Sequence, residues 1–450
     1  MNRLIQLNKT TAVFFVVLGL GCFCLSPLAP ALSPPPDGGY LNANTAEGDF
    51  ALQSLTTGRE NTAIGWNALS GNTTDSDNTA TGLNALHDNN GEANTATGAG
   101  ALQRNTTGSN NTATGVAALA GNTTASGNTA NGHEALNNNN GANNTGIGAS
   151  ALEFSTTGNY NTASGFVALR NNASGDFNTA TGAGALFFNT ADENTATGAA
   201  ALLHNTTGSN NTAAGSGALF NNTTGAHNTA NGDQGLSSNT TGNDNVALGF
   251  LAGNSQTTGS NNVYIGSNIL GVAGENNVCY IGSIFGQTSA NGVPVLINSD
   301  NKLGTATSSA RFKRDIHDMD KASEALFALR PVAFRYKKEI DPAGISQLGL
   351  VAEDVEKVNR DLIVRDKDGK PYSVRYDQVN AMLLNEFLKE HRAFVQEQHK
   401  VEAQEATIAE LKAGIANLTA TVKEQGAQIQ KVSAQLELNK SGPQTVLNNQ

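Results

Sequence analysis

The same short unit recurs every sixteen or seventeen residues from Asn44 to about Gly282. It reads Asn-Thr-Ala-x-Gly-x-x-Ala-Leu and is followed by a polar turn of asparagine, threonine and glycine; good copies begin at Asn61, Asn94, Asn111, Asn178 and Asn211. Self-similarity at a fixed period is typical of a solenoid, in which each coil stacks on the next. The repeat over residues 44–286 therefore predicts an elongated array.

The residue types of the unit favour strands over helices. Glycine and asparagine recur too often for helices, whereas threonine or valine beside alanine suits extended segments. One unit has room for two strands of about five residues and two tight turns, which together form one coil of a narrow β-solenoid. Thr62 and Ile64 share one face of their strand, and the pair Ala68-Leu69 is expected to fill the other side of a thin core.

This core is lean in apolar side chains. Alanine, threonine and one leucine per coil bury little apolar area, at about 25 cal/mol per Å². Such a roll is marginal against the entropy of ordering its backbone. We therefore expect several chains to associate side by side and to bury one face of each roll, as an obligate oligomer.

Charge and cysteine content exclude several classes of function. The net charge is -11, and the only basic residues between positions 44 and 300 are Arg59, Arg104 and Arg170. This surface would repel phosphate, so nucleic-acid binding is disfavoured. Cys279 is the only cysteine beyond position 24, so no intrachain disulfide framework is expected in an exported chain. The histidines lack metal-ligand spacing, and we expect neither a metal nor a cofactor.

The N-terminus has the pattern of an export signal. A basic start precedes an apolar run over residues 11–25, and Ala29-Pro30-Ala31 offers a small-residue cleavage site. The run is short for a membrane span. Residues 1–31 are therefore expected to be a signal peptide, which leaves a secreted or surface-displayed chain without a membrane span. An uncleaved anchor and a lipoprotein acceptor at Cys22 are the alternatives.

The repeat is similar to the left-handed parallel β-roll heads of trimeric autotransporter adhesins, which carry a related Asn-Thr-Ala-x-Gly-x-x-Ala unit. That resemblance implies a trimeric roll and an adhesin-like fibre. Another interpretation is an ice-binding face built from Thr-x-Thr rows, but Asn131, Ala214 and Asn231 interrupt the rows. Calcium binding would need regular aspartates, and Asp75, Asp77 and Asp176 are sporadic.

Beyond Gly286 the repeat ends and the composition changes. Residues 287–307 are small and polar, as in a connector, and charged residues then become frequent. The next segments predict a small α+β domain, with a helix over 321–329, a strand over 332–336 and an apolar element over 348–355. A hairpin is expected with its turn at 366–371.

Residues 377–440 carry a sustained heptad repeat. Apolar residues recur every seven positions at Phe387, Phe394, Val401, Ile408, Ile415, Val422, Ile429 and Leu436. Leu411, Leu418 and Val432 occupy the second seam position, which Gln404 and Gln425 interrupt. More than three heptads in register favour a long helix in a coiled coil over an isolated amphipathic helix. Such a seam permits dimers or trimers, and a trimer agrees with the roll.

A run of motifs then gives a second resemblance. In order they are Ser-Ser-Ala-Arg-Phe-Lys-Arg-Asp-Ile (308–316), Leu-Arg-Pro-Val-Ala-Phe-Arg-Tyr (329–336), Gln-Leu-Gly-Leu-Val-Ala-Glu-Asp-Val (347–355), Val-Arg-Tyr (374–376) and Met-Leu-Leu-Asn-Glu (382–386). Residues 308–400 resemble the intramolecular chaperone auto-processing domain found at the C-termini of phage endosialidases, tail fibres and tail spikes. The resemblance implies that this domain trimerises the preceding fibre and then removes itself.

The same resemblance implies a Ser-Lys dyad of Ser308 and Lys313, with cleavage between Thr307 and Ser308. A serine hydroxyl needs a neighbouring base, and a lysine serves as one when burial lowers its pKa. Ser309 lies one residue too close to Lys313, and Arg314 cannot act as a base. A solvated lysine in a basic run is the alternative for Lys313.

Together these patterns predict a secreted trimeric fibre with a C-terminal chaperone that acts once, in cis, as a self-cleaving serine endopeptidase. The rod would bind a host surface or glycan through repeated loops near Trp66, Phe154, Tyr160 and Phe177. One rival is a phage tail fibre or spike that binds a host receptor. The other is a purely structural fibre whose trimerisation domain does not cut.

Overall fold

A computed structural model describes residues 41–440 and residue 442. The described chain divides into two compact units between Thr288 and Ser289. The predicted signal peptide at residues 1–31, with Cys22, lies outside the described residues. The first unit begins with a short 3-10 helix, η1 (Leu41–Ala43).

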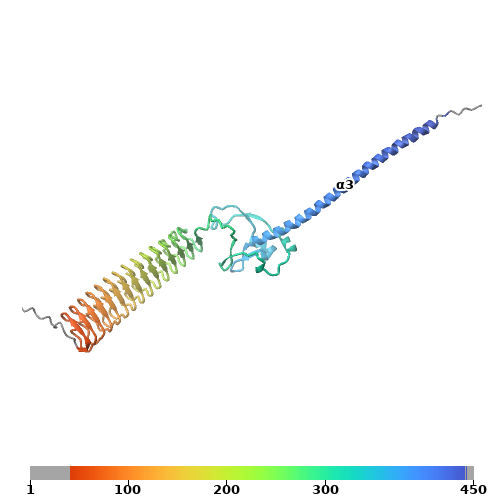
Figure 1. Cartoon of the computed structure of the whole chain (residues 1–450). Helices are drawn as coiled ribbons and strands as arrows, with labels where there is room; N and C mark the ends of the chain where they lie inside the picture. The colour runs from red at the N-terminus through yellow and green to blue at the C-terminus, as the bar shows by residue number, and fades with distance from the viewer. Residues whose placement is uncertain (1–40, 441, 443–450) are drawn as a thin grey trace, which may run out of the picture. The chain divides into compact units, whose positions relative to one another are not determined.

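The first unit is a parallel β-solenoid, as the repeat predicted. Its single sheet of fifteen strands runs in sequence order from β1 to β15, and each strand pairs in parallel with the strand of the next coil (Figure 1). Each coil contributes one strand of three residues rather than the two longer strands expected. The strands are β1 (Thr45–Glu47), β2 (Thr62–Ile64), β3 (Thr79–Thr81), β4 (Thr95–Thr97), β5 (Thr112–Thr114), β6 (Thr129–Asn131), β7 (Thr145–Ile147), β8 (Thr162–Ser164), β9 (Thr179–Thr181), β10 (Thr195–Thr197), β11 (Thr212–Ala214), β12 (Thr229–Asn231), β13 (Val246–Leu248), β14 (Val263–Ile265) and β15 (Cys279–Ile281).

The strand faces are arranged differently from the expected core. Thr62 and Ile64 do share a face, but it is the outer one, and the residue between them, Ala63, is fully buried. Ala68 and Leu69 are also fully buried, which confirms their predicted place in the core. From β1 to β13 the inward position of the strand is alanine or glycine, which suits the narrow coil.

In the coils from Leu52 to Leu236, the turn after the strand contains a buried leucine with a left-handed backbone conformation. Leu69 has a φ of 50°, and its equivalents in the other coils repeat this value closely. An L-residue in this region costs about 1–2 kcal/mol, so burial of the leucine side chain must offset strain in every coil. The stacked leucines are Leu52, Leu69, Leu86, Leu102, Leu119, Leu136, Leu152, Leu169, Leu186, Leu202, Leu219 and Leu236.

The glycine after each strand is required by close stacking of the coils. Gly65 has a φ of 128°, and a Cβ built on it would lie 2.7 Å from the carbonyl oxygen of Gly82 in the next coil. Both the dihedral angle and the available space therefore exclude a side chain. This explains why glycine recurs at the fifth position of the repeat unit.

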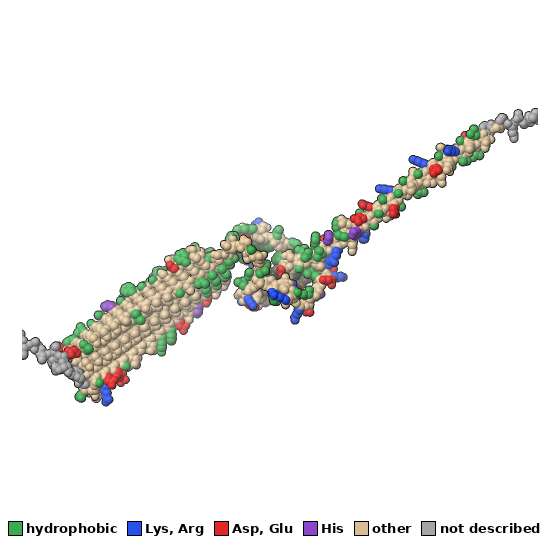
Figure 2. Space-filling view, viewed as in Figure 1, with side chains coloured by type: hydrophobic (Ala, Val, Ile, Leu, Met, Phe, Trp, Pro, Cys, Tyr) green, Lys and Arg blue, Asp and Glu red, His purple; other side chains and the backbone are tan. Residues whose placement is uncertain are grey.

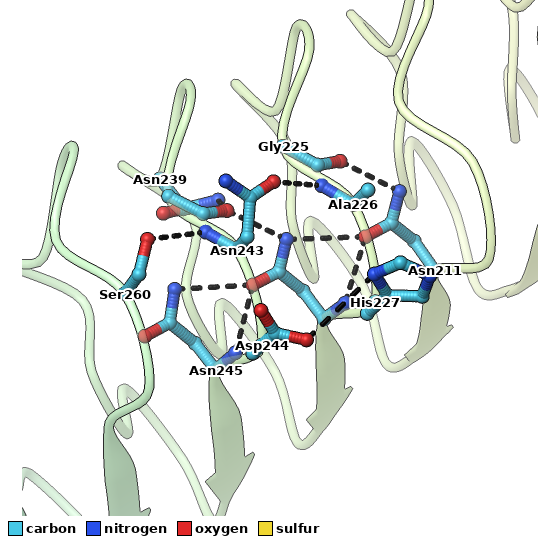
Figure 3. Close-up of polar contacts among 11 residues, drawn as sticks. Asn211, Gly225, Ala226, His227, Asn239, Asn243, Asp244, Asn245 and Ser260 are labelled. Carbon is cyan, nitrogen blue, oxygen red and sulfur yellow. Dashed lines mark hydrogen bonds and ion pairs between the residues drawn. The ribbon is translucent and has the colours of Figure 1, made fainter. Parts of the chain in front are cut away.

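A ladder of buried asparagines runs along the inside of the solenoid. The side chain of Asn211 accepts a hydrogen bond from the backbone N–H of Asn228 at 2.9 Å and donates to the carbonyl of Gly225 at 2.8 Å. Asn228 repeats both contacts one coil further on: it accepts from the N–H of Asn245 at 3.0 Å and donates to the carbonyl of Gly242 at 2.8 Å. Figure 3 shows the contact between Asn211 and Gly225. Because these amides satisfy backbone groups of the adjacent coil, they act as structural residues of the core and not only as turn formers.

A second buried ladder stands beside the first, and Asn194 of the first ladder donates to Oδ1 of Asn189 in the second at 3.2 Å. Asn222 donates through Nδ2 to Oδ1 of Asn205 at 2.7 Å, and Asn239 donates to Oδ1 of Asn222 at 2.9 Å. Ser155 replaces asparagine in this column, and its buried hydroxyl has no hydrogen-bond partner. The ladder is therefore broken at this coil.

The last coils repack around one large side chain. Tyr264 stands at the inward strand position that alanine occupies in most other coils, and it is fully buried. Gly253 replaces the stacked leucine, and a Cβ on it would lie 2.7 Å from the Tyr264 ring. The ring of Tyr264 also stacks on that of Tyr280 at 5.8 Å. Burial raises the pKa of Tyr264 to about 12.

The second unit contains three small antiparallel sheets, five helical segments and many connecting loops. Most segments lie near their predicted positions, although the predicted helix at 321–329 is a 3-10 helix. The elements are β16 (Val295–Ile297) paired with β17 (Leu303–Thr305), η2 (Ala310–Phe312), η3 (Asp320–Ala328), β18 (Val332–Phe334) paired with β19 (Gln347–Gly349), α2 (Ala352–Val358), η4 (Arg360–Leu362), β20 (Ile363–Arg365) paired with β21 (Pro371–Val374), and α3 (Tyr376–Lys440).

The core of this unit is small. Its fully or nearly buried apolar residues are Val355, Leu362, Ile363, Val374, Val379 and Met382. The long helix α3 confirms the predicted helix over 377–440, and only its first two turns reach this core. The heptad residues of α3 are exposed in the single chain, for example Phe394 and Ile415.

Candidate cleavage site

The predicted cleavage segment surrounds the short helix η2. The N–H of Phe312 donates to the carbonyl of Ser309 at 3.0 Å, and the N–H of Lys313 donates to that of Ala310 at 3.0 Å. Ser308 therefore precedes one tight turn and Lys313 follows it. The residues on both sides of this turn are exposed.

The single chain does not assemble the predicted dyad. Thr307, Ser308 and Lys313 are all exposed, and no hydrogen bond joins Ser308 to Lys313 in the described part of the chain. A serine hydroxyl needs a neighbouring base, and Lys313 does not contact Ser308, so this conformation lacks an activated nucleophile. The roles of Ser308 and Lys313 stay a prediction.

The neighbouring side chains make few contacts that could fix this segment in place. The Arg311 guanidinium lies over the Phe312 ring, 4.5 Å from its centroid. Arg314 lies 3.8 Å from the Asp315 carboxylate, with both side chains almost fully exposed. An exposed ion pair of this kind contributes little to stability. Phe312 and Ile316 expose 60% and 68% of their surface, so the segment presents apolar side chains to solvent.

A buried polar cluster joins η3 to α3, and sequence reasoning missed it. The hydroxyl of Ser323 is fully buried; it accepts a hydrogen bond from Nδ2 of Asn385 at 2.7 Å and donates one to the carboxylate of Glu386. The Lys389 ammonium donates to Glu386 at 2.7 Å and lies 3.4 Å from the Ser323 hydroxyl. Hydrogen bonds from Lys389 and then from Ser323 lower the pKa of Glu386.

The geometry gives this cluster a structural role. Ser323 has the partners of an activated serine, but its full burial leaves no access for a peptide bond from elsewhere in the chain. The cluster instead fixes the start of α3 against η3, just beyond the cleavage segment in sequence. The spacing of 62 residues between Ser323 and Asn385 gives no signal in the sequence.

A second polar contact connects α2 to the loop before β18. Arg330 donates to the Asp354 carboxylate at 2.7 Å, and Lys357 donates to the same group at 3.0 Å. These hydrogen bonds, with that from Arg330 the stronger, lower the pKa of Asp354. Near it, the N–H of Leu350 donates to the Tyr376 hydroxyl at 3.0 Å. Arg330 and Asp354, which belong to two of the predicted motifs, thus meet in this unit.

The side chains suggested for ligand recognition lie on the solenoid surface. Trp66, Phe154, Tyr160 and Phe177 are all exposed. The rings of Tyr160 and Phe177 come from successive coils and stack in parallel at 5.1 Å. Figure 2 shows that charged side chains are sparse on the visible face of this unit. The structure holds these rings in place, and a ligand for them remains a prediction.

Among residues 41–440, no three histidine, cysteine, aspartate or glutamate side chains gather closely enough to hold a metal ion. None of the helices in the described ranges has the length and hydropathy needed to cross a membrane.

Comparison with known proteins identifies one segment. Residues 308–364 match the family model described as chaperone of endosialidase. The match begins at the predicted nucleophile Ser308 and spans η2 to the start of β20. No curated protein and no solved structure matches the chain. A parallel β-solenoid followed by a chaperone-of-endosialidase segment fits a fibrous protein of the tail-fibre or endosialidase kind.

Proposed function

We propose that this chain is a secreted, trimeric, adhesin-like fibre whose C-terminal third directs trimerisation and then releases itself. The observation that carries this proposal is the chaperone-of-endosialidase match at 308–364, which follows the solenoid after the connector at 287–307. In this function the solenoid is the mature product, and the second unit serves during assembly.

The exposed apolar side chains of the second unit support trimerisation. Six buried residues form its core, whereas large apolar residues such as Leu348, Phe327 and Ile340 expose between 68% and 85% of their surface. Along α3 the heptad residues from Phe387 to Leu436 are exposed as well. A helix with such a stripe gains stability by burying it in a coiled coil. In this proposal three copies of α3 form the coiled coil, and the solenoid is left-handed.

The proposed cleavage occurs after assembly. In the trimer the segment around η2 is buried, and burial of a lysine favours its neutral amine. The amine of Lys313 accepts the Ser308 hydroxyl proton while Oγ attacks the carbonyl carbon of Thr307. The peptide C–N bond breaks as the amide nitrogen of Ser308 is protonated, which leaves an ester between Thr307 and Oγ. Water then hydrolyses this ester and restores the hydroxyl.

A time course on denaturing gels tests this function. We expect the full-length chain to be replaced by two fragments, the smaller of which begins at Ser308. Ser308→Ala and Lys313→Ala abolish the conversion, whereas Ser309→Ala, the matched control, leaves it intact. A wild-type trimer that stays full-length would refute self-cleavage and leave the non-cleaving structural fibre. A monomeric chain in sedimentation would refute the chaperone role.

The rival function, a phage tail fibre that binds a host receptor, differs at the N-terminus. A fibre assembled in the cytoplasm does not need residues 1–31 as an export signal. Fusing residues 1–40 to a periplasmic reporter enzyme separates the two: export of the reporter supports the secreted fibre, and its retention supports the tail fibre. A glycan array with the purified rod tests the proposed recognition of host glycans by the exposed aromatic residues.

A further inference from the structure

The outer face of the solenoid sheet changes character near its C-terminal end. Its two columns of outward side chains are the first and third residues of each strand. From β1 to β12 the first column is threonine throughout. From β13 to β15 it becomes Val246, Val263 and Cys279, and the third column becomes Leu248, Ile265 and Ile281. We call these six residues the apolar end face.

The apolar end face is contiguous, with five of its six residues exposed and Val263 half-buried. The strand pairing places Val246 beside Val263 and then Cys279 in one row, with the three third-column residues in the parallel row. Leu248 exposes 49% of its surface and Ile281 43%. No charged residue lies on these three strands.

Isolated apolar residues elsewhere on the sheet differ from this cluster. Ile64 in the third column is exposed, but its neighbours in that column are Glu47 and Thr81. Ile147 likewise has Asn131 and Ser164 as its neighbours. Single apolar side chains are normal on a surface, whereas a contiguous patch marks an interface. Only β13–β15 carry such a patch across both columns.

We propose that the apolar end face packs against the same face of other copies of this chain, and that the threonine-faced coils before it remain hydrated. The inference rests on the proposed trimer and names where its rods meet. An uncharged, flat surface meets its own equivalent without like-charge repulsion. Equivalent residues lie close together where they approach a symmetry axis.

The position of the apolar end face in the chain favours other copies of the chain as its partner. β13–β15 are the last coils before residues 289–450, the unit that carries the chaperone-of-endosialidase match and the unpaired heptads of α3. Copies joined by that unit hold their final coils at a high local concentration, which favours contacts too weak to form between separate chains. The copies are therefore joined at the final coils, and not along the whole sheet as the lean core first suggested.

Cys279 provides a native probe of this contact. A disulfide requires Cα atoms within about 7 Å of each other, and a short bis-maleimide extends that reach. In the full-length chain with Cys22→Ser and Cys24→Ser, we expect oxidation or the bis-maleimide to produce a covalent dimer through Cys279. The matched control carries Cys279→Ser and Thr129→Cys, which moves the thiol to the same column in β6. We expect this control to give no covalent dimer.

The outcomes separate this inference from the proposed function. Sedimentation that finds a monomer refutes the trimer itself. A trimer in which Cys279 reacts with neither reagent to form a dimer overturns the end-face contact alone. A trimer in which Thr129→Cys cross-links as fully as Cys279 overturns its restriction to the final coils. Capping of the face by this chain's own second unit is excluded when the Cys279 dimer forms.

Substituting residues of the apolar end face tests the proposed contact independently. Val263→Thr together with Ile265→Thr extends the threonine pattern into β14, and we expect the Cys279 cross-link to be lost. Ile64→Thr with Ile147→Thr is the matched control and should leave the cross-link unchanged. Circular dichroism checks that both variants keep the solenoid. An unchanged cross-link in the β14 variant overturns the proposal.

Discussion

Two asparagines of the same ladder should differ sharply in their contribution to stability. Asn178 is satisfied at both ends: its Oδ1 accepts from the N–H of Asn194 at 2.9 Å, and its Nδ2 donates to Oδ1 of Asn161 at 3.1 Å and to the carbonyl of Ala191 at 2.8 Å. Asn128 accepts in the same way from Asn144 at 2.9 Å, but its buried Nδ2 has no partner.

The structure sets the expected magnitudes. Asn178→Ala removes three buried hydrogen bonds, at about 1 kcal/mol each, and so lowers the free energy of unfolding by about 3 kcal/mol. Asn128→Ala removes one hydrogen bond and also deletes an unsatisfied donor, so its cost is at most about 1 kcal/mol. Both variants remove an asparagine side chain from a fully buried position, so the packing that they lose is similar. The difference of about 2 kcal/mol corresponds to about a 30-fold change in the local unfolding equilibrium.

Urea unfolding followed by circular dichroism measures the overall loss, and amide hydrogen exchange measures it coil by coil. Exchange is needed because each coil of a solenoid contacts only its neighbours, so its opening is partly local. We expect the amide of Asn194 in Asn178→Ala to lose more protection than that of Asn144 in Asn128→Ala. Thr112→Ala, on the outer face, is the control. Equal losses in the two variants would refute the reasoning that amide satisfaction sets stability here.

Three further changes test other parts of the structure. Ser155→Asn restores the second ladder and should raise the free energy of unfolding by about 1 kcal/mol in urea titrations; a decrease would show that this coil has no room for the amide. Gly253→Leu collides with the ring of Tyr264 and should lower the midpoint of thermal unfolding, while adding Tyr264→Ala, which recreates the pattern of earlier coils, should recover it; no recovery would contradict the assigned clash. The pKa of Glu386 is lowered in the folded chain, so its stabilisation is complete above the ordinary carboxyl pKa and is lost as pH falls through the lowered value. Glu386→Gln should therefore weaken the attachment of α3 to η3, measured by hydrogen exchange, at pH 7, and the effect should shrink as the pH falls through the lowered pKa of Glu386. An effect that stays constant over the whole acid titration would contradict an ionic role.

Much of the architecture follows from the sequence alone. The period of sixteen or seventeen residues is a direct consequence of stacking identical coils, so the solenoid, the glycine after each strand and the buried Ala68-Leu69 pair could be predicted. The helix over residues 376–440 follows from its heptads, and the segment at 308–364 from its ordered motifs. These features depend on patterns of residues that are close together in the sequence, so the sequence of one chain is enough to predict them.

The tertiary structure decided which polar residues are buried. Asparagine prefers turns, so its recurrence in the sequence indicates a turn whether its amide faces solvent or the adjacent coil. Only stacking places Oδ1 of Asn178 opposite the N–H of Asn194 and turns Thr62 outward. An estimate from apolar area therefore undervalued the core, because it omitted the ladders.

Contacts between residues that are far apart in the chain also could not be predicted from the sequence. Tyr264 fits inside its coil because Gly253 leaves space, and Ser323 is satisfied because Asn385 and Glu386 reach it from a distant helix. Each of these pairs joins residues that no local pattern connects. The period determined the shape of the coil, while contacts between neighbouring coils and between η3 and α3 determined which side chains hold it.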